Sequence, residues 1–214
     1  MTTIIFGIGG IGGALARRLV LKGRPVHLVS RSSEKLQALS LELGNSPFTS
    51  LDCSNPEAVE TAVKAIVASG PVHGLVYAVG SIPLKPLKGT SIIEFQNAMA
   101  LNFMSAAMSV KAATSALSTG PIPGSVVLFS TVAASQGFPN HCAIAAAKGA
   151  IEAFTRSAAS ELSPKIRINC IAPSLTDTPL ASRMTSSEAM RKSLGEVHHT
   201  GRLGPNSNPN FALP

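Results

Sequence analysis

Residues 3–13 read TIIFGIGGIGG, a short apolar run followed at once by a glycine-rich turn. Glycine suits such a turn because the backbone bends tightly and because a pyrophosphate needs bare backbone to approach. The helical pattern that follows offers the phosphates the positive end of its dipole. A Gly-x-Gly-x-x-Gly motif between a first strand and a first helix predicts a dinucleotide site, although a turn without a ligand can have the same pattern. The residues expected to form this site are Gly7, Gly9, Gly10, Ile11 and Gly12.

Beyond this turn, short apolar runs alternate with longer helical patterns. The expected strands are 3–6, 26–30, 48–52, 72–79, 126–130 and 167–172, and the expected helices are 12–22, 33–43, 56–69, 92–117 and 139–162. Strand runs that are apolar on both faces indicate a sheet covered on both sides. The alternation predicts an α/β fold with a doubly wound, Rossmann-like parallel sheet, in a single domain over 1–203. The Pro- and Asn-rich stretch 204–214 is expected to be a flexible C-terminal tail.

The composition excludes several classes of protein. Of the 214 residues, 45% are hydrophobic and 14% are charged, which disfavours a disordered chain. No run approaches roughly 18 unbroken apolar residues, so no membrane span is expected. The net charge of +7 favours an anionic ligand. Because the basic residues are scattered and Trp is absent, a phosphorylated small molecule fits better than nucleic acid.

Cysteine and histidine spacing does not indicate a metal site or a disulfide framework. The three cysteines, Cys53, Cys142 and Cys170, are odd in number and form no Cys-x-x-Cys pair. Adjacent His198 and His199 would point apart on a helix, and no carboxylate lies at metal-ligand spacing from them. A reducing, cytoplasmic location is therefore expected, and the chain start lacks the basic lead of a signal peptide.

The end of the second expected strand bears on cofactor choice. An acidic residue there would bind the ribose hydroxyls of NAD. Residues 29–32 instead read VSRS, and Arg31 can pair with a 2′-phosphate. The sequence thus favours NADP over NAD, with an ordinary surface arginine as the alternative interpretation of Arg31.

From the third expected strand onward, the chain resembles the short-chain dehydrogenase/reductase family, with a similarity that covers about residues 1–204. Asp52 and Cys53 resemble the pair that contacts adenine in that family. The sequence Tyr77-Ala78-Val79-Gly80 stands where the family usually has Asn-Asn-Ala-Gly, and Gly80 is retained. The residues that resemble the segment around the nicotinamide are Pro173, Leu175 and Thr178, although Ser174 replaces a glycine.

The same resemblance assigns catalytic positions and shows one departure. Asn102, Thr131 and Lys148 match the catalytic asparagine, serine and lysine of the family, and the lysine also holds the nicotinamide ribose. The tyrosine position, four residues before Lys148, is Ile144. In the family, that tyrosine gives a proton to the carbonyl oxygen as hydride arrives, and isoleucine cannot do so. A positioned general acid is worth about 10²–10⁴ in rate.

His141 is the candidate replacement for the missing proton donor. It precedes Ile144 by three residues, so we expect it on the same helix stripe as Ile144 and Lys148. Histidine titrates near neutrality and can donate a proton directly or through water. The alternative is that His141 caps the helix start beside Asn140 and is simply solvated. The Thr131 hydroxyl is too weak an acid for this role.

The sequence therefore predicts an NAD(P)-dependent oxidoreductase that acts on a small carbonyl or alcohol substrate with an altered proton donor. A non-catalytic NADP-binding protein, regulatory or scaffolding, is the alternative, and an isomerase or lyase with a prosthetic cofactor is a third hypothesis. The family segment resembled by 199–204 leads into one more helix and strand, which the tail replaces here. We expect a homodimer through the long helices 92–117 and 139–162 rather than a tetramer through that edge.

Overall fold

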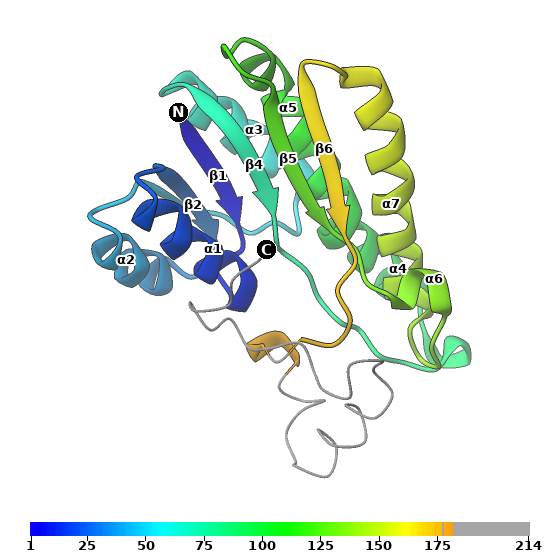
Figure 1. The fold of residues 1–214 in the computed structure, drawn as a ribbon. Coiled ribbons are helices and arrows are strands. Elements are labelled where there is room, and N and C mark those ends of the chain that lie inside the picture. Colours follow the sequence, from blue (N-terminus) through cyan, green and yellow to red (C-terminus); the bar gives the residue numbers. More distant parts are fainter. Residues whose placement is uncertain (177, 182–214) are drawn as a thin grey trace.

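The computed structural model describes residues 1–176 and 178–181, which form a parallel sheet with helices on both faces (Figure 1). Its six strands lie in the order β3-β2-β1-β4-β5-β6. They are β1 (Thr2–Phe6), β2 (Val26–Ser30), β3 (Phe48–Ser50), β4 (Val72–Tyr77), β5 (Gly124–Phe129) and β6 (Ile166–Ile171). The strand order reverses between β1 and β4, where Phe6 pairs with Tyr77. This arrangement confirms the predicted doubly wound parallel sheet.

Neighbouring residues of β1 serve two different cores. Ile5 packs with Ala16 of α1 (Gly10–Leu21) and Leu36 of α2 (Ser33–Glu42). Ile4 instead belongs to the larger core on the opposite face. The helices that contribute to that larger core are α3 (Pro56–Ala68), α5 (Ser105–Ser118) and α7 (Cys142–Leu162). Since successive side chains of a strand point to opposite faces, the consecutive apolar residues Ile4, Ile5 and Phe6 of β1 require this double coverage.

The expected helix 92–117 is divided by a π turn. The segment consists of α4 (Ile92–Met99), the π-helical η2 (Ala100–Met104) and α5 (Ser105–Ser118). One inserted residue shifts the helical period only locally, so the apolar spacing does not reveal it. The turn matters because π turns are frequent at functional sites and because Asn102 lies inside this one.

Other element boundaries also differ from the expectation. The helix expected at 139–162 begins at Cys142, because Asn140 has a φ of 66°, which a helix interior does not accommodate. The strands expected at 48–52 and 72–79 end at Ser50 and Tyr77. After its last residue, each of these two strands keeps one further hydrogen bond to its neighbour and then continues as a loop. After β4, for example, the Ala78 amide donates to the Phe6 carbonyl at 2.8 Å.

The carboxyl ends of the strands meet at one edge of the sheet, the usual ligand position in open α/β folds. The segment after β6 passes along this edge and ends in the short helix η3 (Pro179–Ala181), drawn in orange in Figure 1. Two further short helices, η1 (Leu87–Gly89) and α6 (Ala133–Gln136), follow β4 and β5. Within the described residues, no helix is long and apolar enough to cross a membrane. The proposed domain boundary at 203, the tail 204–214, His198 and His199 lie outside the described residues.

Candidate active site

The glycine turn between β1 and α1 is required by backbone geometry. Gly7 has a φ of 83°, and a Cβ there would lie 2.8 Å from the Ala78 carbonyl oxygen. A Cβ on Gly12 would collide with the Gly7 carbonyl oxygen. Around Gly9, the N-cap of α1, the Cβ position has no neighbour within 4 Å. The turn therefore presents an open stretch of bare backbone at a helix start, which fits the pyrophosphate of a dinucleotide.

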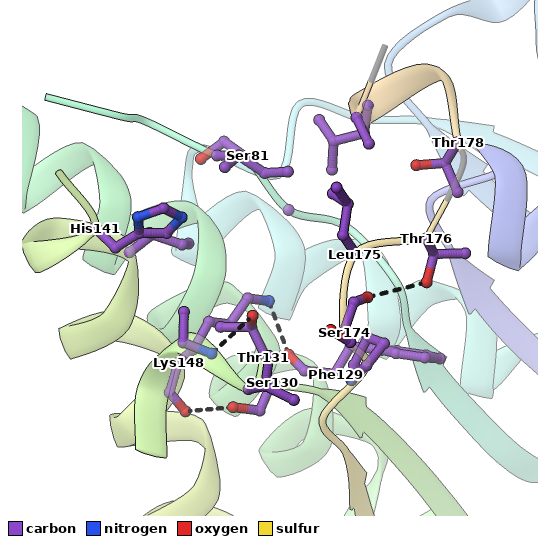
Figure 2. Close-up of a pocket in the computed structure, with 18 of the residues that line it drawn as sticks. Ser81, Phe129, Ser130, Thr131, His141, Lys148, Ser174, Leu175, Thr176 and Thr178 are labelled. Atoms are coloured by element: carbon purple, nitrogen blue, oxygen red, sulfur yellow. Dashed lines mark hydrogen bonds between the residues drawn. The ribbon is translucent and has the colours of Figure 1, made fainter. Parts of the chain in front are cut away.

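The segment after β6 returns to this turn. A Cβ on Gly10 would lie 2.8 Å from Cγ2 of Thr178, so the two segments are in direct contact. Together they border a cavity of about 460 Å³ (Figure 2). The residues from the predicted dinucleotide site that line this cavity are Ile11, Gly80, Lys148, Pro173, Leu175 and Thr178.

At the far end of the predicted dinucleotide site, Arg31 and Asp52 are exposed. The Asp52 carboxylate accepts a hydrogen bond from the Ser54 amide at 3.0 Å, and this contact holds the pKa of the carboxyl below its usual value, with the Arg31 charge adding a smaller effect. Cys53 lies beside Asp52, but its side chain is in the larger core, and burial raises the pKa of its thiol to about 11. The Cys53 thiol therefore packs in the core, and the exposed side chain of this predicted pair is that of Asp52.

Lys148 is a buried cation at the cavity floor. It is only 7% exposed, and its ammonium donates to the Phe129 carbonyl at 2.8 Å. Burial lowers its pKa to about 8. A Cβ on Gly80 would lie 3.6 Å from Lys148 Nζ and 3.1 Å from Asn102 Oδ1. The fold thus brings Gly80, Asn102 and Lys148 together from three separate elements.

The side chain of Asn102 is fully buried and fully hydrogen-bonded. Its Oδ1 accepts from the Ser81 amide at 3.1 Å. Its Nδ2 donates to the Ala98 carbonyl at 3.0 Å and to Ser81 Oγ at 3.1 Å. The amide therefore fastens the start of the loop after β4 to the π turn.

Thr131 follows β5 and lines the cavity. Its Oγ1 accepts from the Ala133 amide at 3.3 Å, which leaves the hydroxyl hydrogen for another acceptor. Its neighbour Ser130 is buried, and the Ser130 hydroxyl lies 2.5 Å from Oε1 of Glu152 and 3.3 Å from the Lys148 carbonyl oxygen. Ser130 thus ties the end of β5 to α7, while Thr131 faces the ligand space.

Ile144, for which the sequence predicts the position of the family tyrosine, lines the cavity and is 3% exposed. Tyr77, the only tyrosine of the chain, lies in the core, where burial raises its pKa. The Tyr77 hydroxyl donates to the Leu101 carbonyl in the π turn at 2.8 Å. Its role is to brace that turn, and it does not line the cavity.

His141 lines the cavity together with Ile144 and Lys148, but it is the N-cap residue of α7 and not a residue within the helix. Its imidazole makes no capping hydrogen bond. Instead, Nδ1 lies 2.7 Å from the Pro139 carbonyl oxygen, and the ring packs against Phe138 at 5.6 Å between centroids. A carbonyl only accepts hydrogen bonds, so Nδ1 carries a hydrogen and the neutral ring keeps its lone pair on Nε2.

The cavity is otherwise mainly apolar. Val79, Ile82, Val132 and Leu175 are among its lining residues. No aspartate or glutamate lines it within the part of the chain that the structure describes. Sequence reasoning missed Ser81, a lining residue whose only signal in the sequence is its place directly after Gly80.

A family model described as enoyl-(acyl carrier protein) reductase matches residues 7–208. Dehydrogenase/reductase SDR family member 4 of Rattus norvegicus is 29% identical to the chain over 202 residues, which is 91% of this chain and 72% of that protein. The chain belongs to the short-chain dehydrogenase/reductase family. This finding confirms the family resemblance drawn from the sequence.

Other proteins similar to this dehydrogenase/reductase chain are named with a nicotinamide cofactor. Carbonyl reductase [NADPH] 2 of Sus scrofa is 28% identical over 200 residues, which is 92% of this chain and 81% of that protein. The solved structure of ElxO with NADP bound superimposes with a TM-score of 0.85 at 26% identity and covers 95% of this chain and 85% of that one. A variant of ElxO with a tyrosine replaced by phenylalanine was solved with NADPH bound and has the same TM-score of 0.85.

Proposed function

We propose that this protein is an NADP-dependent oxidoreductase that acts on a carbonyl or alcohol substrate and uses a proton donor other than tyrosine. The observation that carries the proposal is the gathering of Asn102, Thr131 and Lys148 near one cavity that reaches the glycine turn. The relatives named for NADPH-dependent carbonyl reduction and for bound NADP support the same function.

The chain offers a contact for each part of the cofactor. The backbone of Gly7, Gly9 and Gly12 would hold the pyrophosphate. The residues that would hold its other parts are Arg31 at the 2′-phosphate, Asp52 at the adenine, Lys148 at the nicotinamide ribose, and Pro173, Leu175 and Thr178 around the nicotinamide. When bound, NADPH supplies a hydride to the substrate carbon.

Lys148 is prepared to bind hydroxyl groups. One hydrogen of its ammonium is committed to the Phe129 carbonyl, and two remain for ribose oxygens. With a pKa of about 8, the group is still mostly charged at neutral pH. No carboxylate lines the cavity among the described residues, so the ammonium faces the ligand without a competing partner there.

We assign the proton donor to His141 and the alignment of the carbonyl to Thr131. The Thr131 hydroxyl has its hydrogen free to donate to the substrate oxygen. The hydrogen bond from His141 Nδ1 to Pro139 fixes the ring, and protonation at Nε2 gives an acid that can reach the substrate directly or through one water.

A non-catalytic NADP-binding protein is the second candidate. Ile144 favours it, because the substitution removes the family proton donor and leaves the cofactor contacts in place. The ElxO variant with one tyrosine hydroxyl removed still bound NADPH, so cofactor binding and a complete set of tyrosines are separable in that protein. We also propose the predicted homodimer through α5 and α7, for which light scattering is the direct test.

The proposed activity is tested by NADPH oxidation against a panel of aldehydes and ketones, after a thermal-shift series with NAD, NADH, NADP and NADPH. We expect wild type to turn over and His141→Gln to lose about 10²-fold or more in kcat while keeping NADPH affinity. His73→Gln is the matched control, since His73 lies at the opposite end of β4 from the cavity. Binding of NADPH without turnover of any substrate supports the second candidate and contradicts the first.

A further inference from the structure

Ser81 is a polar residue of the cavity lining that has no part in the proposed function. It follows Gly80 in the loop after β4, and its side chain is drawn on the same side of the cavity as His141 in Figure 2. Its backbone amide donates to Asn102 Oδ1. The orientation of the Asn102 amide is fixed by this bond, since only the oxygen can accept from an N–H group.

The fixed amide decides the role of the Ser81 hydroxyl. The two hydrogens of Asn102 Nδ2 go to the Ala98 carbonyl and to Ser81 Oγ. Ser81 Oγ is therefore an acceptor toward Asn102, and its own hydrogen is directed elsewhere. Because Ser81 lines the cavity, this hydrogen is available to an acceptor atom of a bound molecule.

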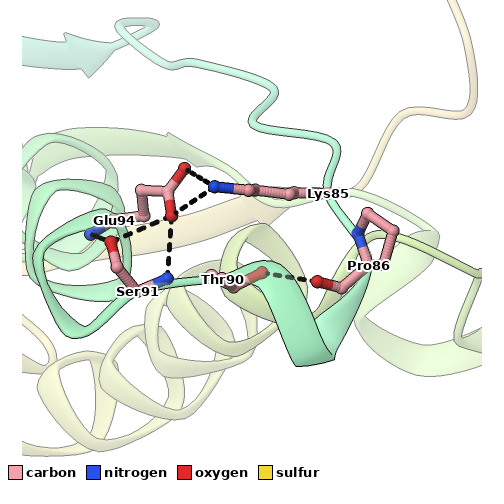
Figure 3. A network of polar contacts seen from close by, with 5 residues as sticks. All are labelled: Lys85, Pro86, Thr90, Ser91 and Glu94. Carbon is pink, nitrogen blue, oxygen red and sulfur yellow. Dashed lines mark hydrogen bonds and ion pairs between the residues drawn. The ribbon is translucent and has the colours of Figure 1, made fainter.

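The loop that carries Ser81 is held at its far end. The Lys85 amide donates to the Asn140 carbonyl at 3.0 Å, next to His141. The Lys85 ammonium pairs with Oε1 of Glu94 at 2.9 Å, and Glu94 also closes the capping box with Ser91 at the start of α4 (Figure 3). The Ser91 amide and the Lys85 charge lower the pKa of Glu94 to about 2, so this brace remains ionised over the working range of pH.

We propose that Ser81 is a specificity-determining residue, whose hydroxyl donates a hydrogen bond to a second oxygen of the substrate, beside the reacting carbonyl. The assignment rests on the proposed function, in which Thr131 already serves the reacting oxygen. The substrates favoured are vicinal dicarbonyl compounds and hydroxyketones rather than plain ketones. A site with an oriented donor discriminates against an analogue that lacks the acceptor, because the donor is then left unpaired.

The test compares matched pairs, 2,3-butanedione with 2-butanone and hydroxyacetone with acetone, in steady-state NADPH oxidation. We expect Ser81→Ala to raise KM for the oxygen-bearing member of each pair about 3- to 10-fold, with kcat changed less than about 2-fold. The plain ketones and the dissociation constant for NADPH should be unchanged. Ser81→Thr retains the hydroxyl and should restore most of the preference. Ser135→Ala is the control, since its hydroxyl bonds to the Val132 carbonyl and does not line the cavity.

Three results would overturn the assignment. A Ser81→Ala variant with the wild-type preference shows that the hydroxyl does not contact the substrate. A weakening of NADPH binding by the same factor shows that the donor serves the cofactor instead. Wild type that binds NADPH and reduces neither member of any pair, nor any member of the wider panel, overturns the proposed function and this assignment with it.

Discussion

The glycine turn and the start of α7 border the same cavity, but different physical constraints determine which residues stand in them. In the turn, a Cβ on Gly7 would crowd the Ala78 carbonyl and one on Gly12 would collide with the Gly7 carbonyl, so backbone geometry alone dictates the residue. At α7, no backbone constraint distinguishes isoleucine from tyrosine at position 144, and the choice lies in side-chain chemistry. The comparison teaches that steric constraints of the backbone fix the residue in the turn, whereas those constraints leave position 144 open to change.

The largest effect is expected from the turn itself. In Gly12→Ala, the new Cβ must displace the Gly7 carbonyl, so we expect the free energy of unfolding to fall by about 3 kcal/mol and NADPH binding to be lost. Gly9→Ala is the matched control for stability, because its Cβ would meet no protein atom within 4 Å. Urea unfolding measures the loss of stability, and calorimetric titration measures NADPH binding by Gly12→Ala. Equal losses of unfolding free energy in both variants would show that the backbone argument is wrong.

Lys148 lies in α7 and lines the cavity that the glycine turn borders. Its buried ammonium makes the free energy of unfolding depend on pH, and the sign of this dependence follows from its pKa. Its pKa of about 8 lies below the ordinary value of 10.5, so the unfolded chain binds more protons between these values and stability gains with rising pH. Relative to Lys148→Met, the free energy of unfolding of wild type should increase by on the order of 3 kcal/mol from pH 7 to 10.5.

The same lysine variant should bind NADPH weakly at every pH, because the ribose contacts are gone. Chemical unfolding at several pH values and calorimetric titration provide the measurements. Parallel stability curves for wild type and Lys148→Met would mean that the ammonium is not desolvated in the folded protein.

A smaller effect is expected at the 2′-phosphate. Loss of a charge-assisted bond costs about 1.5–3 kcal/mol, so Arg31→Ala should weaken NADPH binding about 10- to 150-fold and leave NADH binding nearly unchanged. Arg24→Ala removes the same charge near the other end of β2 and controls for the net charge of the protein. If wild type binds NADH as tightly as NADPH, the assignment of Arg31 fails.

The smallest effect is expected from Tyr77→Phe, a substitution in the larger core. The ring contact with Phe6, 5.4 Å between centroids, is kept, and the hydroxyl with its bond to the Leu101 carbonyl is removed. We expect a loss of about 1 kcal/mol in the free energy of unfolding, with NADPH affinity changed less than about twofold. Ser109→Ala, which removes another buried hydroxyl bond in α5, is the comparison. A large loss of NADPH affinity would give Tyr77 a direct part in the site.

The fold and its glycine turn could be predicted because their signals are local. The run 3–13 contains strand, turn and helix start in one stretch, and the steric demands on Gly7 and Gly12 come from neighbouring backbone. The predicted boundaries of helices and strands were wrong where the spacing of apolar residues does not determine them. The φ of Asn140 delays the start of α7 and places His141 outside the helix, which no spacing of apolar residues shows.

The remaining site residues depend on contacts between distant parts of the sequence. Ser81 is oriented by Asn102, which lies 21 residues further along the chain in a π turn that the pattern does not reveal. The sequence also could not show that the Cys53 thiol turns into the core while Asp52 stays exposed. In both cases the residue type could be read from the sequence, but the direction of the side chain could not.

The central claim is that the substrate side of this cavity lacks a tyrosine hydroxyl at position 144 but keeps Asn102, Thr131 and Lys148. Ile144→Tyr tests it most directly, because a phenol at the cavity face would stand one helical turn before Lys148, whose ammonium would lower its pKa. NADPH oxidation should be measured for wild type and variant at equal cofactor saturation. The account predicts unchanged NADPH affinity and a rise in kcat for carbonyl reduction of about 10²-fold or more. A variant that binds NADPH and reduces carbonyls no faster than wild type would contradict it.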